Sequence, residues 1–160
     1  MTKIEIVTRI KSTAEICFDL SRSIDLHKIS TEGTNETAIA GTTTGLINLH
    51  ETVTWEATHF GIRQRLTSHI SVYDRPHHFR DEQLKGIFRS FVHDHFFEEK
   101  DGTVIMTDML EFQSPFGIAG RLFNKLILTN YLTKFLIDRN RHIKAYAESE
   151  DWRSVIPEKD

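Results

Sequence analysis

Residues 87–113 read IFRSFVHDHFFEEKDGTVIMTDMLEFQ, and this stretch decides the fold. Two apolar-rich alternating runs flank Asp101-Gly102, a pair typical of the two-residue turn of a β-hairpin. With these residues as the loop, Lys100 pairs with Thr103, and the register of both strands follows. The sequence therefore predicts a long antiparallel hairpin.

That register predicts which side chains share a face, because side chains alternate between the two faces of a strand. The pairs that fall on one face are Phe97 with Met106, His95 with Asp108, His93 with Leu110, and Phe91 with Phe112. The opposite face is more polar, so we expect the face that carries the two histidines to look inward. An apolar face that carries two histidines and a carboxylate favours a lined cavity over a dry core.

The composition is typical of one globular domain. The chain has 160 residues, of which 39% are hydrophobic and 27% charged, enough for a single buried core. A formal net charge of -3 gives no basic footprint for nucleic acid. Cys17 is the only cysteine, which excludes an internal disulfide and a cysteine-based zinc site. No apolar run reaches the ~20 residues of a membrane span, and the N-terminus lacks a signal-peptide core. We therefore expect a cytoplasmic protein.

The rest of the chain is predicted to build a sheet and a long helix around the hairpin. The expected elements, in order, are a strand at 3–11, a short helix capped by Ser12 or Thr13, a second short helix at about 23–28, an irregular connection at 29–45, a meander of strands at 46–113, and a helix at about 118–148.

The long helix is predicted to pack on the sheet. Its apolar face is wide for five turns and becomes polar toward Arg139, Arg141 and Lys144, which we expect to be solvated near the helix C-terminus. We expect one α+β domain over residues 1–150, in which a curved antiparallel sheet of six to seven strands wraps the helix. Residues 151–160 are expected to form a frayed tail.

Three stretches carry a resemblance to a known superfamily. They are TWEATHFGIRQRLTSHI (54–70), FRDEQLKGIFRSFVHDHFFEE (79–99) and MTDMLEFQSPFGIAGRLFNKL (106–126). These stretches resemble the SRPBCC proteins, which are START-like, Bet v 1-like and polyketide-cyclase-like, in an uncharacterised bacterial-type branch. The resemblance implies the helix-grip (Bet v 1-like) fold, with a ligand held between the sheet and the long helix. It implies no activity, because this fold hosts binders, transporters, cyclases and regulators.

The turn near Lys85-Gly86 decides which residues of the preceding strand join the histidine face. The pairs predicted by a three-residue loop at 84–86 are Asp81 with Arg89, Phe79 with Phe91, and His77 with His93. The pairs predicted by a two-residue loop are Glu82 with Arg89 and His78 with His93. We favour the first, because it pairs two aromatic rings and two opposite charges.

Candidate ligand-binding residues come from both walls of the expected cavity. On the sheet they are Trp55, Phe79, Asp81, Arg89, Phe91, His93, His95, Phe97, Met106, Asp108 and Leu110; on the helix they are Phe123, Ile127 and Tyr131. Three interpretations of the polar members stay open. They form satisfied cross-strand pairs; or His93, His95 and Arg89 orient an acidic or hydroxylated apolar ligand; or the group is catalytic or metal-binding.

We expect a non-enzymatic domain that binds a small hydrophobic or amphipathic ligand, with no metal and no cofactor. One alternative is a cyclase or hydrolase acting on a polyketide-like or aromatic substrate, with His95 and Asp108 as the acid–base pair. A second alternative is a regulatory module that binds another protein. The sequence predicts neither the ligand nor the oligomeric state.

Overall fold

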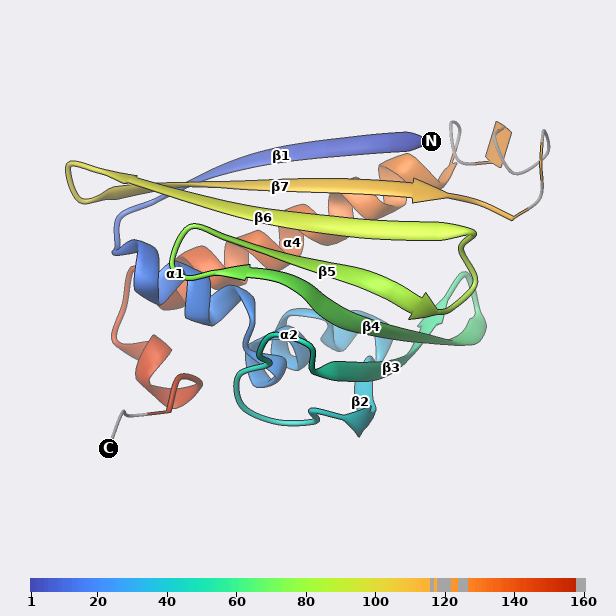
Figure 1. The fold of residues 1–160 in the computed structure, drawn as a ribbon, viewed down its shortest axis with the longest axis horizontal. Coiled ribbons are helices and arrows are strands. Elements are labelled where there is room, and N and C mark those ends of the chain that lie inside the picture. Colours follow the sequence, from blue (N-terminus) through green and yellow to red (C-terminus); the bar gives the residue numbers. More distant parts are fainter. Residues whose placement is uncertain (116, 118–121, 124–126, 158–160) are drawn as a thin grey trace.

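A seven-stranded antiparallel sheet curves around one long helix (Figure 1) in this computed structural model, which describes residues 1–115, 117, 122–123 and 127–157. The strands are β1 (Thr2–Ile10), β2 (Thr37–Gly41), β3 (Thr52–His59), β4 (Ile62–Asp74), β5 (His78–Lys85), β6 (Ser90–Lys100) and β7 (Thr103–Gln113). Their order in the sheet is β1-β7-β6-β5-β4-β3-β2. The predicted α+β class and helix-grip fold are confirmed.

Two short helices follow β1, as predicted, and each begins at a hydroxyl cap. The helices are α1 (Ala14–Ser21), α2 (Ile24–Ser30), the 3-10 helix η1 (Glu32–Thr34), the long α4 (Thr129–Ala147) and the 3-10 helix η3 (Asp151–Ser154). The side chains of Thr13 and Ser23 accept hydrogen bonds from backbone N–H groups in the first turns of α1 and α2. The predicted start of the long helix at Ile118 lies outside the described residues.

The β6–β7 hairpin has the predicted register at every position. Lys100 lies opposite Thr103 and His95 opposite Asp108. Asp101 and Gly102 form the turn with φ of 52° and 73°, the left-handed conformation that a tight hairpin of this kind requires. Along β7, buried and partly exposed residues alternate without interruption, so one face points into the core.

The predicted β5–β6 register is wrong. Asp81 lies opposite His93, not Arg89, and Phe79 lies opposite His95. Neither His77 nor His78 faces His93, because His78 lies opposite Phe96. The connection between the strands, residues 86–89, is longer than either predicted loop. The side chain of Gln83 bridges it, with Nε2 donating to the carbonyl of Phe88 at 2.8 Å.

Two other predictions need correction. The segment expected to be irregular, 29–45, contains the end of α2, η1 and the edge strand β2. The expected frayed tail begins instead with η3, and Val155 is buried in the core. The Ser23 hydroxyl also donates to the Val155 carbonyl. None of the helices in the described part of the chain combines the length and apolar character that crossing a bilayer requires.

The core has two apolar clusters with a polar group between them. The first lies under α1 and α2, where the Phe18 ring meets Tyr73, Phe79 and Phe97 with ring centroids 5.2–5.4 Å apart. The second contains Ile4, Leu110, Phe112, Leu128 and Leu136. Along β6, Phe97 belongs to the first cluster and Phe91 packs against the second, so His93 and His95 lie between the two clusters.

Candidate ligand pocket

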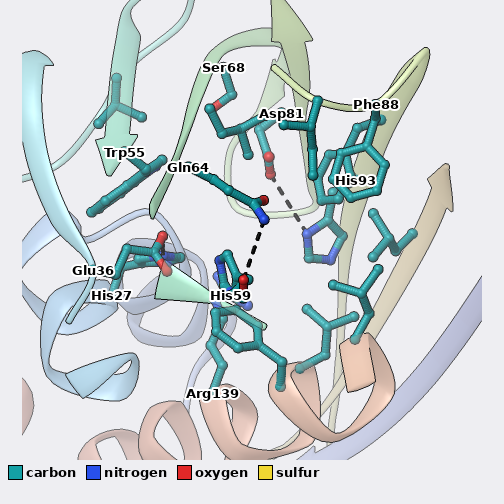
Figure 2. Close-up of a pocket in the computed structure, with 18 of the residues that line it drawn as sticks. His27, Glu36, Trp55, His59, Gln64, Ser68, Asp81, Phe88, His93 and Arg139 are labelled. Atoms are coloured by element: carbon teal, nitrogen blue, oxygen red, sulfur yellow. Dashed lines mark hydrogen bonds and ion pairs between the residues drawn. The ribbon is translucent and has the colours of Figure 1, made fainter. Parts of the chain in front are cut away.

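A cavity of about 900 Å³ lies between the sheet and the long helix. Ten of the predicted binding residues line it: Trp55, Phe79, Asp81, Phe91, His93, His95, Leu110, Phe123, Ile127 and Tyr131. Figure 2 shows polar side chains from β3, β4, β5 and β6 facing Arg139 of α4 across this space. Its volume falls within the range of roughly 300–1,000 Å³ typical of small-molecule sites.

The other four predicted residues do not line the cavity. Phe97 and Met106 are buried in the first core cluster. Asp108 is fully buried behind the two histidines. Arg89 is exposed on the β5–β6 connection, because the register that would have carried it inward does not form.

Two histidines and two carboxylates form a connected group in one wall. Nε2 of His93 lies 2.9 Å from Oδ1 of Asp108, and Nε2 of His95 lies 2.8 Å from Oδ2 of Asp81. Nδ1 of His95 is also 2.9 Å from Oδ1 of Asp108. That contact falls outside hydrogen-bond geometry, so this nitrogen has no hydrogen-bond partner among the described residues. The predicted His95–Asp108 pair is therefore close in space, but both nitrogens of His95 already face carboxylates.

The surroundings shift the pKa values of this group in different directions. Burial alone would raise the pKa of Asp108, but the hydrogen bond from His93 and the close approach of the His95 imidazole outweigh it and hold the pKa well below its usual value. Burial lowers the pKa of His93, and the neighbouring His95 adds to this effect. Burial also opposes charge on His95, yet the carboxylates of Asp108 and Asp81 raise its pKa.

The long helix fixes this group from the other side. Nδ2 of Asn140 donates to Oδ2 of Asp108 at 2.6 Å. Nη1 of Arg139 lies 3.6 Å from Oδ1 of the same carboxylate, and Nη2 donates to the carbonyl of Ser21 at 2.8 Å. The prediction that Arg139 is solvated is wrong: it is only 6% exposed. Its spacing from Leu136 and Ile143 on the buried helix face could have indicated this.

A second polar group lies nearer β2 and was missed in the sequence. Nε2 of His27 is 2.8 Å from Oε1 of Glu36, and the ring of His27 packs on Trp55 with centroids 4.2 Å apart. The other oxygen of Glu36 is buried and has no hydrogen-bond partner within the described residues. Glu36 falls in the segment predicted to be irregular, so the sequence carried no periodic signal that placed it in the wall.

Apolar side chains surround one end of the cavity. Five residues that line it are 40–62% exposed: Phe60 from the β3–β4 turn, Ile62 at the start of β4, Ile87 from the β5–β6 connection, and Phe123 and Ile127 from the helix side. The ring of Phe60 lies 4.7 Å from Tyr131 and 5.8 Å from Phe123, centroid to centroid. These exposures place the mouth of the cavity at this end.

The fold and the cavity define a helix-grip protein with an internal pocket, and solved structures share this architecture. TTHA0849 from Thermus thermophilus matches with a TM-score of 0.71 at 14% identity, over 91% of this chain and 99% of that one. The major latex-like protein 151 of Panax ginseng matches with a TM-score of 0.68 at 18% identity, over 92% and 98%. A START superfamily protein of Mycobacterium smegmatis gives 0.67 at 8% identity, over 91% and 97%.

Sequence comparison alone finds no relative: no protein-family model and no curated protein matches this chain. The structural likeness therefore shows the Bet v 1-like and START fold, and the site's chemistry has to be argued from its own residues.

Proposed function

We propose that this protein binds a small, largely apolar molecule with a polar head group in the cavity between the sheet and α4. The single observation that carries the proposal is the cavity itself, about 900 Å³ of space in a domain of 160 residues. Protein interiors are normally packed to crystal-like density. The side chains that line a space of this size lack part of their packing contacts, and a bound guest molecule would supply them.

The distribution of side chains supports an amphipathic guest. Most of the wall is aromatic or aliphatic, as is usual for ligand pockets. The polar groups gather at the His93–His95–Asp81 wall and at the His27–Glu36 pair. A guest with its apolar body against the rings and a hydroxyl group near Arg139 and His93 would match the apolar wall and the first of these polar groups.

The acid–base alternative has weaker support. A general base needs a nitrogen within reach of the substrate proton, and both nitrogens of His95 lie within 2.9 Å of carboxylate oxygens. His95 is also only 1% exposed.

Binding can be tested by thermal shift and native mass spectrometry with fatty acids, sterols and aromatic polyketides. A ligand at one hundred times its Kd stabilises by about 2.7 kcal/mol, so we expect the Tm to rise by about 5–10 °C. A matched pair of variants identifies the cavity as the site. Ser68 is buried and lines the cavity, so Ser68→Phe should fill the space and abolish the shift.

Thr67→Phe is the control, because Thr67 points to the other face of β4, where its hydroxyl lies 2.9 Å from that of Thr54. This variant should bind like the wild type. If no compound of the three classes shifts the Tm or adds mass, or if Ser68→Phe binds unchanged, the protein does not hold a guest in this cavity.

A further inference from the structure

We propose that Asp81, His93 and His95 form a binding site for one divalent transition-metal ion such as Zn²⁺. Each residue offers a ligand atom, and the three atoms lie within 4.8 Å of one another. Oδ2 of Asp81 is 3.9 Å from Nδ1 of His93 and 2.8 Å from Nε2 of His95. These separations bracket the distance of about 3.4 Å between two ligands on a tetrahedral ion bound at about 2.1 Å.

The register of β5 and β6 creates this trio. Asp81 lies opposite His93, and His95 is two residues further along the same face of β6. The predicted pairing of Asp81 with Arg89 was wrong and did not place this carboxylate opposite the two imidazoles. Such a set is a common ligand group for zinc and for non-haem iron(II).

Asp108 holds the two imidazoles from behind. Nε2 of His93 donates to its Oδ1 at 2.9 Å, so the lone pair of His93 resides on Nδ1, the nitrogen that faces Asp81. The far nitrogen of His95 lies at the same distance from this oxygen. A carboxylate that contacts the distal nitrogen of a metal-binding histidine is the usual outer support of such sites. Here Asp108 hydrogen-bonds the ring of His93 and contacts that of His95 outside hydrogen-bond geometry, and Asn140 fixes the carboxylate in turn.

The position of the trio leaves room for further ligands. Asp81, His93 and His95 all line the cavity, whereas Asp108 does not. An ion held by three protein atoms would keep at least one coordination position directed into this space. A water molecule or the polar head of a guest would occupy that position, but the ion site itself does not depend on a guest.

Charge also favours a cation here. Two carboxylates, Asp81 and Asp108, share the wall with one guanidinium, Arg139, at 3.6 Å from Asp108. With both imidazoles neutral, these described groups carry one uncompensated negative charge in a buried place, which is costly. Either a proton on an imidazole or a metal ion compensates it, and the two are distinguished by experiment.

The test uses the wild-type full chain after removal of metals by chelator and dialysis. Titration with Zn²⁺ by calorimetry should give one equivalent per chain, and Co²⁺ should give the visible absorption of a nitrogen- and oxygen-ligated ion. His93→Asn and His95→Asn should each weaken Zn²⁺ binding by at least a hundredfold. Asp108→Asn, which removes the outer support, should weaken it by about 10–100-fold.

His78→Asn is the matched control. His78 lies on β5 beside Asp94 of β6, with Nε2 and Oδ1 2.6 Å apart, on the opposite face of the same two strands. It should bind Zn²⁺ like the wild type.

A measurement on the wild type guards against variants that fail to fold: Zn²⁺ should shift the imidazole NMR resonances of His93 and His95 and leave those of His78 in place. No stoichiometric binding by the wild type, equal loss in His78→Asn, or shifts confined to other histidines would each overturn the site.

Discussion

Asn140 of α4 donates a hydrogen bond to Asp108 of β7, with 2.6 Å between Nδ2 and Oδ2, and both residues are buried. This contact joins the long helix to β7, the second strand from one edge of the sheet, through a hydrogen bond between two polar side chains. The neighbouring Arg139 lies near the same carboxylate. The helix is therefore positioned on the sheet by a polar anchor as well as by apolar packing.

Removing the Asn140–Asp108 hydrogen bond should destabilise the fold. Asn140→Ala leaves an oxygen of Asp108 buried without its donor, and an unsatisfied buried group costs about 1–3 kcal/mol, more when it is charged. We expect the free energy of unfolding in urea to fall by at least that amount. Asn130→Ala, at an exposed position on the same helix, should change it by less than about 0.5 kcal/mol. Equal effects of the two substitutions would show that the contact contributes nothing.

Acid should weaken the fold partly through Asp19. Burial would raise the pKa of this carboxyl, but hydrogen bonds from Arg75 and Arg22 outweigh it and lower the pKa. Because the folded value lies below the unfolded value of about 3.9, the ionised form stabilises the fold above that pH. The stabilisation is lost as pH falls through the folded pKa.

Asp19→Asn should therefore destabilise the protein by about 1.5–3 kcal/mol at pH 7, and the difference from the wild type should shrink as pH falls from 5 to 3. Urea unfolding across this range measures it. Glu56→Gln is the control, because the pairs of Glu56 with Arg63 and Arg65 lie at the surface and should matter little. A pH-independent difference for Asp19→Asn would contradict the linkage.

Phe60 lies at the mouth of the cavity, and its own backbone conformation is strained. Its φ of 51° lies in the left-handed region, which costs a bulky residue about 1–2 kcal/mol. Its two ring contacts, with Tyr131 and Phe123, stabilise the fold by about 0.5–1.5 kcal/mol each and so offset this strain. Phe60→Asn relieves the backbone and loses the contacts, so we expect little change in Tm.

The same substitution should speed the release of a bound guest, because it removes a ring from the mouth. Stopped-flow dissociation of a fluorescent fatty acid would measure the rate, with Ile39→Asn on the exposed part of β2 as the control. An unchanged dissociation rate in Phe60→Asn would place the exit elsewhere.

Local chemistry made the β6–β7 hairpin predictable from the sequence. Asp101-Gly102 allows one turn geometry, so the register of β6 and β7 followed correctly from it. The β5–β6 connection has no such signal. Its four residues are bridged by the side chain of Gln83, which stands in for backbone pairing, and no count of loop residues reveals that.

The site was predictable where it depended on alternation and not where it depended on distant pairing. The inward direction of the His93 and His95 side chains was predictable, because side chains alternate between the two faces of a strand. Asp81 was predicted in the wall, but its pairing with Arg89 was wrong, because the β5–β6 register could not be read from the sequence. Arg139 was missed, because placing it required reading a charged residue as part of a buried helix face. β2 was missed because four of its five residues are exposed, so it carries no apolar alternation.

Hydrogen exchange should differ along α4. Ile143 and Ala147 are buried in the first core cluster, next to the Asn140 anchor, whereas Tyr131 and Leu132 face the cavity and are only partly buried. We expect amides near Ile143 to exchange more slowly than those near Leu132. Uniform exchange along the helix would contradict this.

The anchor at Asn140 sits toward one end of α4, and the mouth of the cavity lies at the other. Asn140 and Arg139 hold the helix against the sheet beside the imidazole–carboxylate wall, so we expect any displacement of the helix to be smallest there. We therefore expect a widening of the entrance to disturb the imidazole–carboxylate wall little, so that a guest is exchanged while the polar groups near its head keep their spacing.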